Sequence, residues 1–135
     1  MPKAVLISIR PEWCQKIASG EKTIEVRKTI PHMVPPFKCY IYQCLPKRGD
    51  WNVRDGHVIG EFVCDNVAKY WANSMGFSAL SADSLVPARD LHAYAQPRDY
   101  LYGWHISDLN IYDEPKALRD FGLKRAPQSW QYVFI

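Results

Sequence analysis

The sequence predicts one α+β domain over residues 1–135, a small mixed β-barrel of five or six strands with short helices at the crossings. The length of 135 residues suits one domain with its own core. Hydrophobic residues make up 47% of the chain, and tryptophan, tyrosine and phenylalanine 13%, which is typical of a globular protein. Short apolar or alternating stretches, separated by turn residues, recur along the chain and predict the strands.

The first elements are a strand over 4–9 and a short helix that begins at Pro11. The run AVLISI is apolar throughout, and Pro11 suits the first turn of a helix because its missing N–H has no partner there in any case. Gly20 stands where a left-handed residue would end the helix.

A second strand follows over about 22–28. Strict alternation places Ile24 and Val26 on one face and Glu25 and Arg27 on the other. We expect Lys22 at the mouth of this strand, with its aliphatic stem along the core and its ammonium in a cleft.

The remaining elements are predicted from shorter runs of apolar, aromatic and β-branched residues. The stretch 65–99 has the least regular pattern of apolar residues, and we expect it to be an insertion packed on one end of the barrel. An exposed basic loop carrying Lys47, Arg48 and Arg54 is expected over 45–56. Strands are predicted over 38–44, 57–64, 101–112 and 129–135, and helical pieces over 68–71, 90–95 and 116–121.

Charge and cysteine usage limit the classes of function. The net charge of +3 and the isoelectric point near 8.7 allow nucleic-acid binding without the basic stripe of a dedicated DNA-binding arm. The apolar run at 4–9 is too short for a signal peptide or a membrane span, so we expect a cytoplasmic protein with no membrane partner. The four cysteines form no Cys-x-x-Cys pair, which favours reduced, buried thiols and predicts no metal and no cofactor.

The stretch 19–28 carries the chemistry. It places three cations and two carboxylates among only two apolar side chains, more charge than a strand that only fills a core needs. We interpret Lys22, Glu25 and Arg27 as the lining of a cleft for an anionic, base-containing ligand, flanked by Ser8 and Arg10. Arg27 offers a planar fork to phosphate or a base edge, and Lys22 a point charge. The alternative is that Glu25 and Arg27 form a surface ion pair.

Two residues of the predicted strand 101–112 are further ligand-binding candidates. Trp104 is either a core residue or part of an aromatic wall for a base, and the same choice applies to Trp130. His105 points to the opposite face, where it is either a half-buried structural residue or a ligand contact.

Residues 20–27 match G-x-K-x-x-E-x-R, the signature of the ASCH family, and the chain resembles that family over nearly its whole length. A strand and a helix precede the signature, a Tyr-Gly-Trp-His-Ile-Ser stretch lies at 102–107, and Ala-Pro-Gln-Ser-Trp at 126–130 is similar to the closing segment of the family. The resemblance implies a PUA-like barrel with a cleft near the first helix, in a superfamily whose members mostly bind RNA.

Some ASCH relatives are enzymes, an amidohydrolase acting on acetylated cytidine and a ribonuclease. In the amidohydrolase branch a Lys, a Thr and a Glu act together. Lys22 matches the Lys, but Glu25 stands where that branch has its Thr, and no Glu occurs between Phe62 and Asp113 to match the third residue. The match to this catalytic set is therefore incomplete.

Three functions follow from these observations. The first is a binding module for RNA or a modified nucleotide, and the second is a small hydrolase of a nucleoside amide or an RNA phosphodiester that uses Lys22 and Glu25. The third is a protein–protein adaptor, since fold does not fix function. Binding ranks first because no complete catalytic constellation is present in the sequence, and no stable protein partner is inferred.

Overall fold

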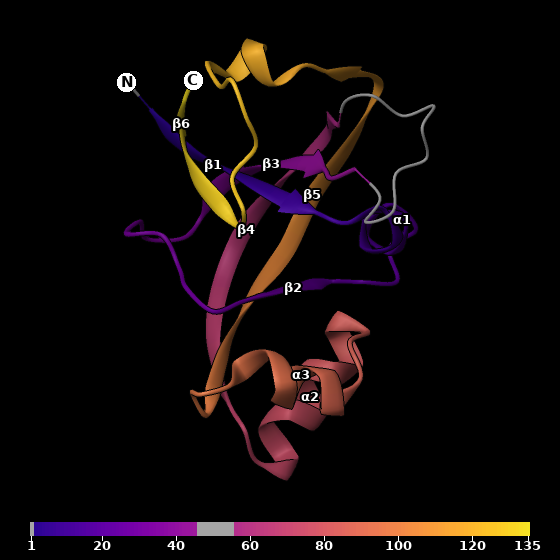
Figure 1. The fold of residues 1–135 in the computed structure, drawn as a ribbon, viewed down its shortest axis with the longest axis vertical. Coiled ribbons are helices and arrows are strands. Elements are labelled where there is room, and N and C mark those ends of the chain that lie inside the picture. The colour runs from indigo at the N-terminus through magenta and orange to yellow at the C-terminus, as the bar shows by residue number, and fades with distance from the viewer. Residues whose placement is uncertain (1, 46–55) are drawn as a thin grey trace.

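The computed structural model describes residues 2–45 and 56–135, which form one six-stranded mixed sheet with helices at its ends (Figure 1). Lys47, Arg48 and Arg54 of the predicted basic loop lie outside the described residues. The elements are β1 (Lys3–Ile9), α1 (Pro11–Ala18), β2 (Ile24–Arg27), β3 (Phe37–Gln43), β4 (His57–Trp71), α2 (Ser74–Ser84), α3 (Ala88–Ala95), β5 (Tyr100–Lys116), the 3₁₀ helix η1 (Leu118–Phe121) and β6 (Trp130–Phe134).

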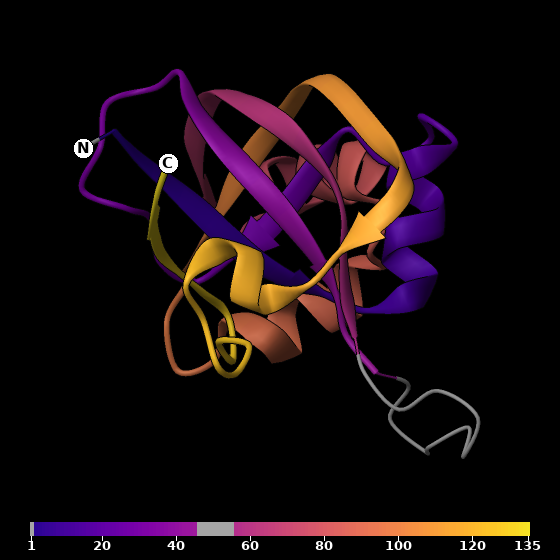
Figure 2. The ribbon, with the colours of Figure 1, turned by 90° about the horizontal axis from the view of Figure 1, so that it is seen from above.

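The strand order is β2-β5-β4-β3-β1-β6, and the long antiparallel ribbon of β4 and β5 forms the centre of the sheet. β1 pairs parallel with β3 and antiparallel with β6, so the sheet is mixed as predicted. Viewed from above, the strands curl around a common interior (Figure 2). β2 and β6 are the two edges of this sheet, and backbone hydrogen bonds do not close it into a continuous barrel.

Side chains bridge the seam between these two edges. Arg27 at the end of β2 donates from Nη1 to Ser129 Oγ at 3.1 Å, just before β6. The Trp130 indole Nε1 donates to Thr29 Oγ1 at 3.0 Å, and the His32 backbone N–H donates to the Tyr132 hydroxyl at 2.7 Å. The barrel is therefore closed here by side-chain hydrogen bonds.

Two clusters of buried side chains position the site. One fills the barrel interior and includes Ile7, Phe62 and Trp104. The other holds α2 and α3 against β2 and β5, where Ile24 packs with Leu80 and its neighbours. Both helices therefore lie at one end of the sheet, as Figure 1 shows and as predicted for the insertion.

The sequence prediction was wrong at 68–71, which belongs to β4. These residues pair with Tyr100–Gly103 of β5, a partner about thirty positions away that a local pattern does not reveal. Helix α2 then falls in the stretch where the pattern was least regular. The predicted left-handed residue after the first helix is confirmed, because Gly20 has φ +82°. The helical pieces predicted near 90–95 and 116–121 are present as α3 and η1.

Candidate ligand-binding cleft

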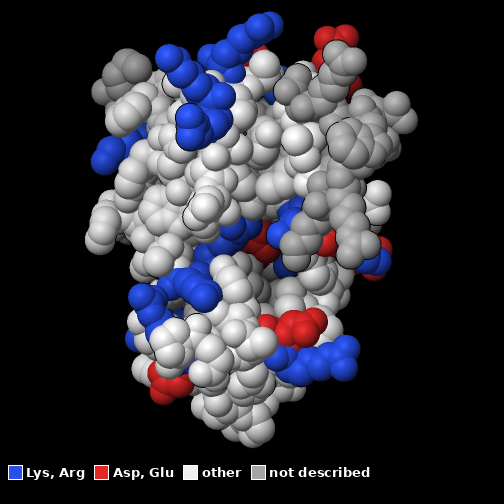
Figure 3. Space-filling view, viewed as in Figure 1, with Lys and Arg blue, Asp and Glu red and all other residues white. Residues whose placement is uncertain are grey.

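A cavity of about 800 Å³ lies between the barrel and the helices. Its walls come from the end of β1, the start of α1, the segment from Lys22 through β2, and α3. Figure 3 shows a hollow near the middle of this face, with both basic and acidic atoms visible inside it. The lining residues include the five predicted residues Ser8, Arg10, Lys22, Glu25 and Arg27.

Lys22 is 2% exposed and lies just before β2. Its ammonium donates to the Ser84 carbonyl at 2.7 Å, and Glu25 Oε1 lies 3.4 Å away. Ser84 is the last residue of α2, so the cation also lies at the negative end of a helix dipole. The ammonium is 4.8 Å from the centre of the Trp13 ring. Burial lowers the pKa of Lys22, and the charge of Glu25 opposes that shift.

Glu25 is the shared partner of both cations. Its Oε2 accepts from Arg27 Nη2 at 2.9 Å, and its Oε1 also accepts from the Val26 backbone N–H at 3.2 Å. Burial alone would raise the pKa of this carboxyl, but the charges of Arg27 and Lys22 outweigh burial and lower the pKa below its usual range. Glu25 is therefore an ionised acceptor in this site.

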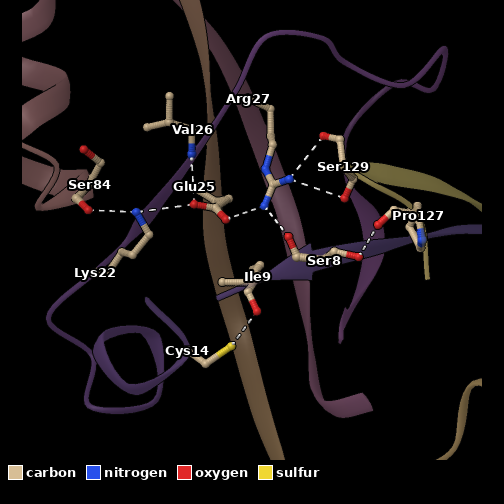
Figure 4. A network of polar contacts seen from close by, with 10 residues as sticks. All are labelled: Ser8, Ile9, Cys14, Lys22, Glu25, Val26, Arg27, Ser84, Pro127 and Ser129. Carbon is tan, nitrogen blue, oxygen red and sulfur yellow. Dashed lines mark hydrogen bonds and ion pairs between the residues drawn. The ribbon is translucent and has the colours of Figure 1, made fainter. Parts of the chain in front are cut away.

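Arg27 holds three parts of the chain together (Figure 4). Nη2 also donates to the Ser8 carbonyl at 2.7 Å, and Nη1 donates to the carbonyl and hydroxyl of Ser129. The Nε atom is buried and has no hydrogen-bond partner within the described part of the chain. Because the side chains of Glu25 and Arg27 are only 7% and 11% exposed, the interpretation as a surface ion pair is wrong.

The lining combines balanced charge with aromatic rings. Among the described lining residues three cations face three carboxylates, so this part of the cleft is less cationic than the stretch 19–28 alone suggests. Trp13 of α1 and Tyr94 of α3 supply the rings. The charged lining residues are Arg10, Lys22 and Arg27 against Glu12, Glu25 and Asp90.

The structure places Trp104 and His105 away from the cleft. Trp104 is fully buried in the barrel interior, with ring contacts to Phe37 at 5.8 Å and Trp130 at 5.9 Å. His105 lies at the surface, where Nδ1 is 2.6 Å from Asp65 Oδ1. Neither residue lines the cavity. On β5, which pairs with β2, Trp104 points into the core and His105 points to the outer face of the sheet.

The aromatic wall is therefore built from residues that the sequence reasoning did not select. Trp13 lies in the predicted first helix, and neither it nor Asp90 and Tyr94 was among the predicted ligand-binding residues. Asp90 and Tyr94 are four positions apart in the predicted helix 90–95, which places them on one helical face. This spacing is the sequence feature that could have indicated their part in the cleft.

One cysteine thiol, that of Cys44, lies in the wall of the cleft. Cys44 lines it and is half-buried, and burial raises the pKa of its thiol. Residues 2–45 and 56–135 contain no cluster of three or more His, Cys, Asp or Glu side chains that could hold a metal ion. Within the same ranges no helix is long and apolar enough to cross a membrane. The predicted cytoplasmic location stays a prediction.

The chain is an open, curled α+β barrel with a buried Lys-Glu-Arg cluster at its mouth. Its fold is that of an ASCH domain. A crystal structure of a tyrosine-to-phenylalanine variant of the ASCH protein from Zymomonas mobilis superimposes with a TM-score of 0.78 at 20% identity, covering 98% of this chain and 91% of that chain. The ASCH structure from Zymomonas mobilis itself gives 0.77 at 21% identity, with 97% and 87% covered.

A serine-to-alanine variant of the same protein gives a TM-score of 0.77 at 20% identity and covers 97% of this chain and 88% of that chain. No family model and no curated protein sequence matches the chain. The resemblance stated from the signature at 20–27 is thus confirmed at the level of the fold, and function is argued from the site itself.

Proposed function

We propose that this protein binds RNA or a modified nucleotide, with one base held in the cleft. The observation that carries the proposal is the buried Lys22-Glu25-Arg27 cluster beside the rings of Trp13 and Tyr94. Buried charges are costly to hold and contribute little net stability, so an arrangement of three in a cavity wall suits recognition better than folding.

The balance of charge favours a base edge over several phosphates as the cleft's ligand. Carboxylates such as Asp90 accept hydrogen bonds from exocyclic amines, and Arg10 donates to ring nitrogens, carbonyls or one phosphate. Tyr94 is 40% exposed, which leaves ring surface for stacking.

The test is a fluorescence-anisotropy titration of a labelled single-stranded RNA of about three nucleotides, a length that one binding site accommodates. Lys22→Met keeps the aliphatic stem and removes the charge, and we expect an affinity loss of about tenfold, the usual effect of deleting one charged contact. The control is Lys16→Met, since Lys16 pairs with Glu21 on the exposed side of the same region. Equal affinity in both variants, with folding verified by circular dichroism, would remove the cleft from the binding site.

A hydrolase is the second candidate, and the lowered pKa of Lys22 favours it. A buried ammonium that gives up its proton more readily is suited to proton transfer. Glu25 is less suited to activating water, because its lowered pKa makes it a weak base. Product formation from an acetylated cytidine or from the same RNA that persists in Lys22→Met would exclude the mechanism through this residue.

A further inference from the structure

A second cavity, of about 440 Å³, lies at the seam of the barrel. The loop that follows β2 passes beside β6 here (Figure 1), and the His32–Tyr132 hydrogen bond joins the two segments. Unlike the cleft, this cavity has no carboxylate among the lining residues that the structure describes, which are Lys28, Thr29, Ile30, His32, Arg98, Tyr102, Trp130 and Tyr132. It therefore suits an anionic ligand that also carries planar rings.

Aromatic side chains continue from this cavity along the end of the sheet. Trp130 and Tyr132 of β6 are 5.4 Å apart between ring centres. On β5, Tyr102 is 5.7 Å from Tyr100, which is in turn 5.6 Å from Trp71 of β4. Trp71 is 48% exposed and the other four are partly exposed. We call these five residues the aromatic strip.

Cations lie over the rings of the aromatic strip. The Lys69 ammonium is 4.0 Å from the centre of the Tyr100 ring and 4.4 Å from that of Trp71. Arg98 lies 5.6 Å from the centre of the Tyr100 ring, and Lys3 lies 4.7 Å from that of Tyr132. Exposed rings interleaved with cations are the combination by which proteins bind single-stranded nucleic acid, with bases on the rings and phosphates at the cations.

Lys28 joins the second cavity to the cleft. Its ammonium is 4.9 Å from the centre of the Tyr94 ring, which lines the cleft, while Lys28 itself lines the second cavity. The Lys28 carbonyl accepts from Arg98 Nη1 at 3.2 Å, which fixes the second cation beside it. A chain of nucleotides leaving the cleft past Tyr94 would therefore reach Lys28 and Arg98 next.

We propose that the aromatic strip and the second cavity form a track for the single-stranded RNA that flanks the base held in the cleft. This inference rests on the proposed function and deepens it, since it makes the ligand a strand rather than a free nucleotide. The charges assign a different role to each site. The cleft, whose described positive and negative charges are equal in number, recognises the base, and the second cavity, with the cations Lys28 and Arg98, holds the backbone.

The experiment compares labelled single-stranded RNAs of about three and about ten nucleotides by anisotropy, at several salt concentrations. We expect the wild type to bind the longer RNA more tightly. The double variant Lys28→Gln/Arg98→Gln should lose about tenfold in affinity for the longer RNA with a shallower salt dependence, and should bind the shorter RNA as the wild type does. The charge-matched control is Arg119→Gln/Lys124→Gln, two exposed cations lining a different cavity. Tyr102→Leu tests stacking separately.

The outcomes separate this inference from the proposed function. If the short RNA binds through Lys22 but the longer one gains nothing, or the gain survives in the Lys28/Arg98 variant, the track is overturned and the cleft stands. If the longer RNA depends on Lys28 and Arg98 but not on Lys22, the track stands and the cleft does not. Absence of binding to either RNA overturns both.

Discussion

At the scale of single residues, Glu25 decides the electrostatics of the cleft. It is 5% exposed and is the carboxylate that pairs with both Lys22 and Arg27. A buried charge that loses its partner is left desolvated without compensation, which costs more than the ion pair itself contributes. The stability of the cluster therefore depends on this residue more than on either cation.

We expect Glu25→Gln to lower the free energy of unfolding by about 3–5 kcal/mol, because two buried cations lose their counter-charge. Urea unfolding of the variant and the wild type measures this difference. Glu21→Gln is the control, because its carboxylate forms the same kind of pair with Lys16 at an exposed position, and it should leave the urea midpoint unchanged. Equal effects of the two substitutions would contradict the burial argument.

The same difference should vanish in acid. The folded-state pKa of Glu25 is lowered, so its ionised form stabilises the fold above the unfolded-state pKa, and this contribution is lost as the pH falls through the folded-state value. Urea midpoints measured from about pH 6 to about pH 3 should therefore converge for the wild type and Glu25→Gln. A gap that stays constant over this range would show that the charge of Glu25 is not its cause.

At the scale of elements, α2 supports the cleft from behind. Its last residue supplies the carbonyl that accepts from Lys22, and its first turn is capped by Asn73, whose Oδ1 accepts from the backbone N–H groups of Met75 and Gly76 at 3.1 and 2.7 Å. The helix carries no acidic residue in its first turn and no basic one in its last. The Asn73 cap stabilises the first turn of this helix, and the Lys22 ammonium stabilises its last.

Asn73→Ala should destabilise the protein by about 1 kcal/mol, the usual cost of deleting a side-chain cap. Thermal and urea unfolding measure the change. Ser78→Ala, at an exposed position in the middle of the same helix, should be neutral or slightly stabilising because alanine is the better helix former. A loss in Ser78→Ala as large as that in Asn73→Ala would mean that the cap is not responsible.

At the scale of the whole molecule, closure of the barrel depends on side chains. The edges β2 and β6 are joined through Arg27, Thr29 and His32 on one side and Ser129, Trp130 and Tyr132 on the other. This seam lies between the cleft and the second cavity, so the same side chains that close the barrel also shape both candidate ligand sites.

Tyr132→Phe keeps the ring and removes the hydroxyl that accepts from the His32 N–H. We expect a loss of about 1 kcal/mol in the free energy of unfolding and faster hydrogen exchange at the His32 amide. The β1–β3 ladder should exchange as in the wild type, because its backbone bonds do not involve the seam. Uniformly faster exchange over the sheet would instead indicate global destabilisation.

The local features of this protein could be predicted from residues that are neighbours in the chain. Alternation along β2 placed Glu25 and Arg27 on one face, and Gly20 marked the end of α1. The signature at 20–27 indicated the fold and three residues of the cleft, Lys22, Glu25 and Arg27. These features depend on residues a few positions apart, whose periodicity and turn preferences can be read directly. The helical prediction at 68–71 failed because its pairing with β5 is not local.

The contacts of these residues, in contrast, depend on the three-dimensional fold. Lys22 contacts a carbonyl 62 positions away, and Arg27 contacts a serine 102 positions away, so their burial depends on how α2 and β6 return to β2. The packing of α3 and β5 likewise puts Tyr94 in the cleft wall and Trp104 in the core. The burial and the hydrogen-bond partners of these side chains depend on contacts between segments that are far apart in the sequence. A local sequence pattern does not indicate which distant segment will pack against a given residue.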